Sequence, residues 1–263
     1  MHKVHRTGMT FPERLRTDRG MIGTFVHIAS PELVEIIGHA GFDFVIVDTE
    51  HGPFGMETAV NLVRAADAAG IFSVVRVADN RASEICKALD TGADGVLIPQ
   101  IATEADARAA VQAAKYYPEG QRGVYPYMRG AAYSAEAGEG FFGRANSETA
   151  VLLLVEGLAG VTNLSSIVSV PDVDSIFIGP MDLSQSVGFP GQVDHPAVRQ
   201  QLQTIIGLAA NQGITAGIYD FDVARSGQWM EMGVGFVAFY VDSAIIYQTY
   251  QEIAQSLRAS ADL

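Results

Sequence analysis

The sequence predicts an α/β protein that folds as one (β/α)8 TIM barrel, a single domain over residues 1–263 that begins with a short N-terminal extension at residues 1–20. Two observations predict this class. Eight short apolar runs alternate with amphipathic stretches, and this alternation is typical of parallel strands joined by right-handed helical crossovers. The length of 263 residues suits one α/β barrel, and eight strand–helix units favour a closed barrel over an open doubly wound sheet.

The apolar runs have the length and composition of buried strands in a parallel sheet. They cover residues 21–28, 42–47, 72–77, 95–99, 150–155, 175–178, 214–219 and 235–241. The main helical patterns cover residues 31–40, 56–69, 82–89, 104–116, 162–168, 196–211, 223–232 and 243–260. Ser30-Pro31-Glu32 supplies an N-cap, a proline and an acid where a helix begins. Glycine at positions 41, 70, 92 and 213 follows predicted helices at the point where helices commonly end.

Two parts of the chain depart from this pattern. Residues 121–147 interrupt it before the fifth strand and are rich in Gly, Tyr and Arg, which indicates a functional insertion. The last predicted helix has an apolar face that could cover the barrel or pack on a partner subunit. That face consists of Ile245, Ile246, Tyr247, Tyr250 and Ile253.

The composition disfavours several classes of partner. Acidic residues outnumber basic residues by 30 to 17, and the net charge of −13 disfavours nucleic acid and anionic membrane surfaces. The chain has no apolar segment of the roughly 18 residues that a membrane span needs, and residues 1–19 do not have the pattern of a secretory signal. Its one cysteine, Cys86, fits a reducing compartment and is expected to pack as a small hydrophobe. We therefore expect a cytoplasmic enzyme that acts on small molecules.

The most informative segment is Asp48-Thr49-Glu50-His51, which follows the second predicted strand. In α/β proteins the carboxyl ends of parallel strands are where ligands bind. Two carboxylates and an imidazole at such a point favour proton transfer or metal chemistry. The alternative is a polar loop with a capping aspartate.

Arg76 lies in the third predicted strand, where an unpaired buried charge is costly. One interpretation is a structural salt bridge with Asp48 or Asp90. The other is an anchor for a carboxylate or enolate oxygen of a substrate, which a guanidinium binds with two parallel hydrogen bonds.

Glu156 and Asp182 follow the fifth and sixth predicted strands. Adjacent strands lie about 5 Å apart, so both carboxylates could reach one ion. Two carboxylates with water and substrate oxygens suit Mg²⁺ or Mn²⁺ better than Zn²⁺. The alternative for Asp182 is an ordinary helix N-cap.

Together these residues resemble the HpcH/HpaI family, the class II (metal-dependent) pyruvate aldolases of the 4-hydroxy-2-oxoheptanedioate aldolase type. The resemblance runs from about Arg16 to Ser256. It rests on residues 40–43, 47–51, 74–76, 92–99, 121–124, 155–156 and 177–184.

The resemblance implies a role for each matching residue. Glu156 and Asp182 would bind a divalent metal (Mg²⁺, Mn²⁺ or Co²⁺), and Arg76 would stabilise an enolate. His51 would be the base, with Asp48 or Asp90 orienting its ring. The backbone N–H groups of Met181 and Asp182, in the turn that begins with Gly179 and Pro180, would hold the pyruvate carboxylate; Pro180 itself has no N–H to offer. The resemblance also implies a hexamer, a trimer of dimers, in which the last helix is exchanged between subunits.

The implied reaction is reversible cleavage of a 4-hydroxy-2-oxo acid into pyruvate, or a close 2-oxo acid, and an aldehyde. Oxaloacetate decarboxylation through the same enolate is an alternative, and a non-catalytic binder of 2-oxo acids is another. Lys87 and Lys115 fall in predicted helices, which argues against a Schiff-base aldolase.

The chain departs from the family pattern at Leu154, where glutamine is common, and at Met181, where alanine is frequent. Tyr125 replaces a usual glycine, and Tyr127 and Arg129 lie in a segment where small residues are common. These three residues could reshape the aldehyde pocket or pack at an interface.

Overall fold

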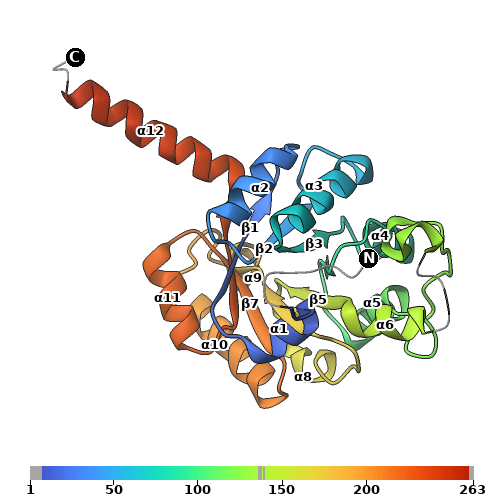
Figure 1. Cartoon of the computed structure of the whole chain (residues 1–263). Helices are drawn as coiled ribbons and strands as arrows, with labels where there is room; N and C mark the ends of the chain where they lie inside the picture. The colour runs from blue at the N-terminus through green and yellow to red at the C-terminus, as the bar shows by residue number, and fades with distance from the viewer. Residues whose placement is uncertain (1–7, 136–137, 139, 261–263) are drawn as a thin grey trace.

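The computed structural model describes residues 8–135, 138 and 140–260, and it confirms the predicted closed barrel of parallel strands surrounded by helices (Figure 1). The strands follow one another around the barrel in sequence order, and β8 pairs with β1 to close it. The strands are β1 Met21–Val26, β2 Phe44–Asp48, β3 Phe72–Arg76, β4 Gly95–Ile98, β5 Ala150–Val155, β6 Ser175–Ile178, β7 Thr215–Asp220 and β8 Phe236–Val241.

Most helices agree with the predicted ones to within a few residues. They are α2 Pro31–His39, α3 Met56–Ala69, α4 Ala82–Asp90, α5 Glu104–Ala114, α10 Pro196–Asn211, α11 Val223–Glu231 and α12 Asp242–Ser260. The helix predicted at residues 162–168 is instead two short helices, α7 Leu158–Thr162 and α8 Leu164–Ile167. Four further elements are α1 Phe11–Thr17, the 3-10 helix η1 Arg129–Ser134, α6 Phe141–Glu148 and α9 Pro180–Val187.

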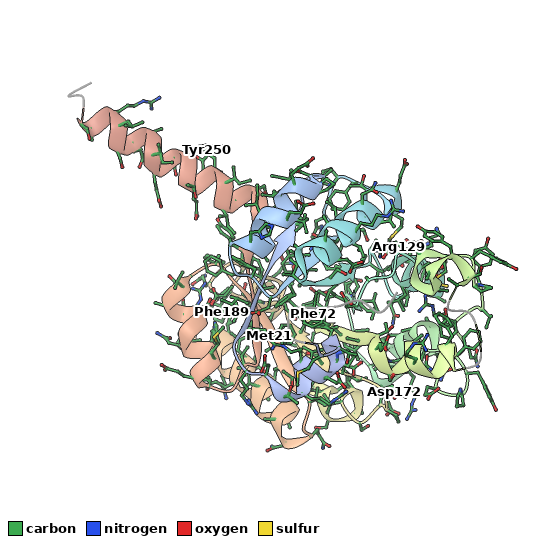
Figure 2. The ribbon with its side chains drawn as sticks, viewed as in Figure 1. Met21, Phe72, Arg129, Asp172, Phe189 and Tyr250 are labelled. Carbon is green, nitrogen blue, oxygen red and sulfur yellow. The ribbon has the colours of Figure 1, made fainter. Side chains whose placement is uncertain are left out.

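The barrel interior is filled by every second residue of each strand, because side chains alternate between the two faces of a sheet. Phe25, Ile46, Val74 and Leu154 are members of this inner cluster, and each is at most 4% exposed. The side chains of Met21 and Phe72 lie within the same interior (Figure 2). Valine, leucine and alanine from the opposite strand faces pack against the surrounding helices. This alternation decides which residues point into the barrel mouth.

α1 closes the amino-terminal end of the barrel, so the second half of the predicted extension belongs to the core. Phe11 and Leu15 are each 1% exposed, and the Phe11 ring lies 5.0 Å from the Phe72 ring. A capping box between Thr10 and Glu13 begins this helix.

α12 projects away from the barrel (Figure 1). Tyr247, Tyr250, Ile253 and Leu257 on this helix are 50–70% exposed. Exchange of this helix between subunits remains a prediction. None of the described helices is long and apolar enough to cross a membrane.

The described residues of the insertion, 121–135, 138 and 140–147, pack at the amino-terminal end of the barrel. Arg122 pairs with Asp90 at the end of α4. Arg129 pairs with Asp67 near the end of α3 and donates to the Thr91 carbonyl oxygen. Because these helices run antiparallel to the strands, their last residues lie at the rim opposite the carboxyl ends of the strands.

Candidate active site

The barrel mouth carries four polar side chains that continue the inward-facing rows of their strands. His27, Asp48, Arg76 and Glu156 each stand two residues after a member of the inner cluster, namely Phe25, Ile46, Val74 and Leu154. Side chains two residues apart on a strand point to the same face. The sequence therefore directs all four toward the axis at the carboxyl-terminal rim, where barrel enzymes hold their chemistry.

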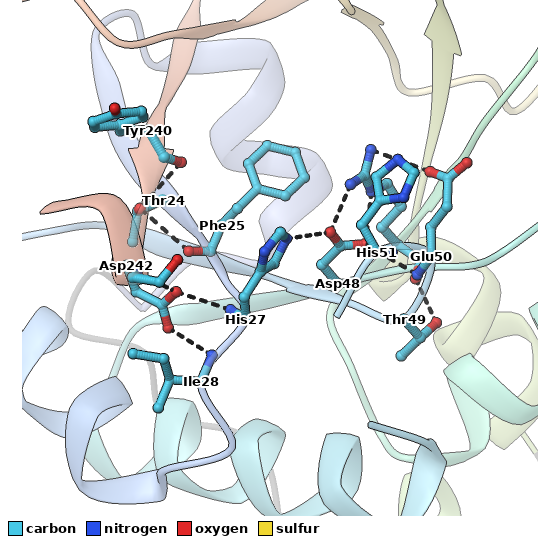
Figure 3. Close-up of polar contacts among 12 residues, drawn as sticks. Thr24, Phe25, His27, Ile28, Asp48, Thr49, Glu50, His51, Tyr240 and Asp242 are labelled. Carbon is cyan, nitrogen blue, oxygen red and sulfur yellow. Dashed lines mark hydrogen bonds and ion pairs between the residues drawn. The ribbon is translucent and has the colours of Figure 1, made fainter. Parts of the chain in front are cut away.

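Asp48 is fully buried and accepts hydrogen bonds on both carboxylate oxygens. Its Oδ1 accepts from Arg76 Nε at 2.8 Å and from the backbone N–H groups of Glu50 and His51 at 3.0 and 3.3 Å. Its Oδ2 accepts from Arg76 Nη2 at 2.6 Å and from His27 Nε2 at 2.5 Å (Figure 3). Burial would raise the pKa of Asp48, but the hydrogen bonds and charges of His27 and Arg76 lower it well below its ordinary value. The carboxylate is therefore ionised at neutral pH.

Arg76 is held between two carboxylates, so the predicted salt bridge with Asp48 is confirmed. Its Nη1 also lies 3.1 Å from Glu50 Oε2, and its guanidinium lies 4.8 Å from the centre of the Phe25 ring. Burial lowers the pKa of Arg76, but Asp48 and Glu50 outweigh it and raise that pKa. A guanidinium has five N–H donors, and these contacts engage about three of them. The structural role therefore leaves donors for a substrate oxygen.

The carboxylates of Glu50 and Glu156 are both influenced by the charges of Arg76 and Asp182. Burial raises the pKa of Glu50, and Arg76 and His51 partly offset it. Burial also raises the pKa of Glu156 to about 7, and the charges of Asp182 and Glu50 add to this rise. Uncompensated negative charge in a partly buried site favours a bound cation or proton.

Glu156 and the start of α9 are packed directly together. Glu156 Oε1 accepts the backbone N–H of Gln100 at 2.9 Å. A Cβ added at Gly179 would lie 2.9 Å from Glu156 Cβ and 3.2 Å from its Oε2, so only glycine fits beside this carboxylate. α9 begins immediately afterwards with Pro180, which places Asp182 in its first turn. The first N–H groups of a helix have no partner within it, so those of Met181 and Asp182 can donate hydrogen bonds to an anion.

The donor set at this rim is compatible with a hard divalent cation. Across the described part of the chain, no three His, Cys, Asp or Glu side chains are grouped so that they could hold a metal by themselves. Mg²⁺ commonly binds through one or two carboxylates and takes its other ligands from water and substrate. Glu156 and Asp182 fit that pattern, and they are the residues that would hold the metal.

His51 lies on the turn after β2 with an exposed side chain. Asp48 accepts the backbone N–H of His51, so this aspartate fixes the turn rather than the imidazole ring. The expectation that Asp90 could orient the ring is wrong within one chain. Asp90 ends α4 at the opposite rim, where Arg122 binds it at 2.8 Å.

The two described lysines are both remote from this rim. Lys115 lies just after α5, a correction to its predicted helical position, and its ammonium donates to the carbonyl oxygens of Asn146 and Thr149. Lys87 lies in the last turn of α4. No lysine in the described ranges is therefore available for a Schiff base at the barrel mouth.

The positions that depart from the family pattern fall in different places. Leu154 lies inside the barrel directly below Glu156, and Met181 is 42% exposed at the start of α9. Tyr125 and Tyr127 are both more than half exposed and pack edge to face, on the loop between Arg122 and Arg129 at the far rim. Within one chain this placement favours packing over a role in the aldehyde pocket.

Sequence reasoning missed two residues of the site. His27 and Tyr219 follow the inward rows of β1 and β7, so strand alternation could have indicated both. Tyr219 stacks edge to face on Phe25 at 5.7 Å, and burial raises its pKa to about 12. Its phenol is therefore neutral and forms an aromatic wall of the mouth with Phe25, Phe221 and Tyr240.

Comparison with known proteins identifies the family. The model of the HpcH/HpaI aldolase/citrate lyase family matches residues 21–248. A "Hydroxypyruvate/pyruvate aldolase" of Sagittula stellata is 37% identical over 90% of this chain and 92% of its own. A "4-hydroxy-2-oxo-heptane-1,7-dioate aldolase" of Salmonella arizonae is 32% identical over 96% of each chain. The crystal structure of a family member from Burkholderia cenocepacia superposes with a TM-score of 0.89 at 30% identity, over 94% of this chain and 98% of that one. The chain therefore belongs to the HpcH/HpaI aldolase/citrate lyase family, as its motifs predict.

Proposed function

We propose that this protein, a carbon–carbon lyase by its family, is a metal-dependent aldolase that cleaves a 4-hydroxy-2-oxo acid into a 2-oxo acid and an aldehyde, reversibly. The observation that carries the proposal is the charged guanidinium of Arg76 at the barrel mouth, which interacts electrostatically with the Glu156 carboxylate. The names of the relatives support pyruvate or hydroxypyruvate as the 2-oxo acid.

The metal would be held by Glu156 and Asp182. When bound, a divalent cation polarises the 2-oxo group and stabilises the negative charge of the enolate oxygen. Magnesium is the cation named for a structural neighbour of the same fold, the citrate lyase beta subunit of M. tuberculosis. We propose Mg²⁺, Mn²⁺ or Co²⁺ for this chain.

Residues of the chain stabilise the enolate, bind the substrate carboxylate and transfer the proton. Arg76 donates a hydrogen bond to the enolate oxygen, where negative charge develops in the transition state. Asp48 keeps the Arg76 guanidinium oriented. The N–H groups of Met181 and Asp182 bind the carboxylate of the 2-oxo acid. His51 takes the proton of the 4-hydroxyl group in cleavage and returns it in synthesis.

Release of pyruvate from 4-hydroxy-2-oxo acids tests this function. The EDTA-treated protein should be inactive, and Mg²⁺, Mn²⁺ or Co²⁺ should restore pyruvate release. Full activity in EDTA would contradict the proposal. Oxaloacetate should be turned over more slowly than the best aldol substrate, and the reverse order would identify a decarboxylase instead.

Replacing His51 by alanine should lower kcat by about 10²- to 10⁴-fold, the usual contribution of a general base. Metal binding should be unchanged, because Glu156 and Asp182 remain. Steady-state kinetics and calorimetric Mn²⁺ titration measure the two quantities. His39→Ala, which changes an exposed histidine at the end of α2, is the matched control and should keep full activity. Loss of Mn²⁺ affinity in His51→Ala would make His51 a ligand rather than the base.

A further inference from the structure

His27 is a second imidazole at the rim, and neither the motifs nor the proposed reaction gives it a role. It follows β1 directly, in the inward-facing row that contains Phe25. Its side chain is 25% exposed, and its Nε2 lies 2.5 Å from Asp48 Oδ2. Figure 3 shows the ring reaching from the end of β1 to this carboxylate. Since an ionised carboxylate only accepts hydrogen bonds, Nε2 is the donor.

The contact matters because Asp48 organises its neighbours. Five hydrogen bonds reach this buried carboxylate, three on Oδ1 and two on Oδ2. Those on Oδ1 fix Arg76 and the turn that carries His51, whereas among the described residues Oδ2 has only Arg76 and His27 as partners. Without His27, Oδ2 would have Arg76 as its one partner. The carboxylate could then rotate and take the guanidinium with it.

The backbone of His27 is hydrogen-bonded to Asp242. Asp242 is the first residue of α12, and it is 2% exposed. Asp242 Oδ1 accepts the backbone N–H groups of His27 and Ser243 at 3.0 and 2.7 Å, and its Oδ2 accepts that of Ile28 at 3.0 Å. These bonds fix the backbone at the end of β1. The ring of His27 is thereby presented to Asp48 from a fixed position.

We propose that His27 is a positioning residue, which is anchored by Asp242 and holds Asp48, and through it Arg76, in the orientation that enolate stabilisation requires. The proposal rests on the proposed aldolase function. His27 contributes a hydrogen-bond donor, and no proton transfer by its ring is involved. Because Arg76 acts on charge that develops in the transition state, its misplacement lowers kcat more than it raises KM.

Two variants of His27 test this role in the full-length Mg²⁺-loaded protein. His27→Ala should lower kcat about tenfold, a typical effect of disturbing a residue that orients an active-site group, while KM changes less than about twofold. In His27→Gln the side-chain amide can donate to Oδ2 in place of Nε2, so kcat should return to within about threefold of the wild type. Exchange of the pyruvate methyl protons in D₂O, which reports enolate formation alone, should follow the same order.

Three outcomes would overturn the role. An unchanged kcat in His27→Ala would mean that the hydrogen bond from His27 to Asp48 does not contribute to catalysis. A rise in KM alone would make His27 a substrate-binding residue. A His27→Gln protein as slow as His27→Ala would show that the ring itself takes part in the chemistry.

A double-mutant cycle tests the link to Asp242. Asp242→Asn leaves one acceptor oxygen in place of two for the backbone N–H groups of His27 and Ile28, and it should lower kcat in the wild-type background. In the His27→Ala background it should add little, because both changes act through one contact. Effects that multiply would overturn this link. If Asp242→Asn does not fold, the two His27 variants decide the proposal alone.

Crystal structures of the two His27 variants separate this proposal from the proposed function. In His27→Ala the Asp48 carboxylate and the Arg76 guanidinium should be displaced, and in His27→Gln both should return. Unmoved side chains in His27→Ala overturn the positioning role whatever the activity. A wild-type protein that neither cleaves aldols nor exchanges pyruvate protons overturns the aldolase function, while the variant structures still decide what His27 positions.

Discussion

Replacing Glu156 by alanine is expected to abolish both metal binding and catalysis. Glu156 is the inward-facing residue after β5, and its carboxylate lies between the Gln100 N–H group and Gly179 at the start of α9. Without it, Asp182 would be the one remaining carboxylate for the metal. We expect Mn²⁺ affinity to fall more than about 100-fold, since even residues that only orient metal ligands contribute 10- to 100-fold. Pyruvate release should become undetectable.

Calorimetric titration of the EDTA-treated protein with Mn²⁺ measures this loss. Glu231→Ala, which removes an exposed carboxylate at the end of α11, is the matched control and should bind Mn²⁺ like the wild type. Circular dichroism should show both variants folded. Wild-type affinity in Glu156→Ala would place the metal elsewhere.

The pKa of Glu156 gives this site a pH dependence with a definite sign. Burial raises that pKa from 4.5 to about 7, so the folded protein favours the protonated form. Metal and proton compete for the same carboxylate, and Mn²⁺ affinity should therefore fall as pH drops through 7, by up to about tenfold per unit. In the metal-free protein, folding stability changes with pH in the opposite direction to Mn²⁺ affinity. The stability that this group contributes is present below the unfolded pKa and is lost as pH rises through about 7. Thermal unfolding of the metal-free protein across pH 4 to 8, with and without Mn²⁺, measures both effects.

Much of the fold could be predicted because the strands are buried on both faces. The short length of continuous apolar runs such as Ala150–Val155 favours a buried strand over a helix, and this strand has the bounds that the sequence predicts. The helices that escaped prediction are short. α1 has seven residues and α9 has eight, too few for a helical period to be distinct. Their roles, closing the barrel and starting beside Glu156, depend on tertiary packing.

The site could be predicted where strand ends carry charged residues, as at Asp48, Arg76 and Glu156. His27 escaped because it lies inside the predicted strand at residues 21–28 and belongs to no recognised motif, and only the closed barrel brings it to Asp48. Asp90 lies away from His51 within one chain. Its role is implied by the family resemblance alone, and strand alternation could not place it, because Asp90 is the last residue of α4, which ends at the opposite rim beside Arg122.

Replacing Arg76 by lysine is expected to lower kcat about 10²- to 10³-fold with a folded protein, the usual loss when one preorganised donor to an oxyanion is removed. Lysine keeps the charge beside Asp48 and Glu50, but its ammonium cannot reproduce the two parallel bonds to Asp48 while also donating to a substrate oxygen. The loss should be in kcat and in pyruvate proton exchange alike, because both depend on the enolate.

Arg76→Met separates this catalytic role from the structural one. It leaves Asp48, which is fully buried, with His27 as its remaining side-chain partner, and breaking a buried ion pair commonly costs about 3–5 kcal/mol. Arg76→Met should therefore unfold at a clearly lower temperature than Arg76→Lys, although both are slow. Arg81→Lys, at an exposed ion pair with Asp79, is the control and should change neither quantity. An Arg76→Lys protein with wild-type kcat would assign Arg76 to structure alone and would transfer enolate stabilisation entirely to the metal held by Glu156 and Asp182.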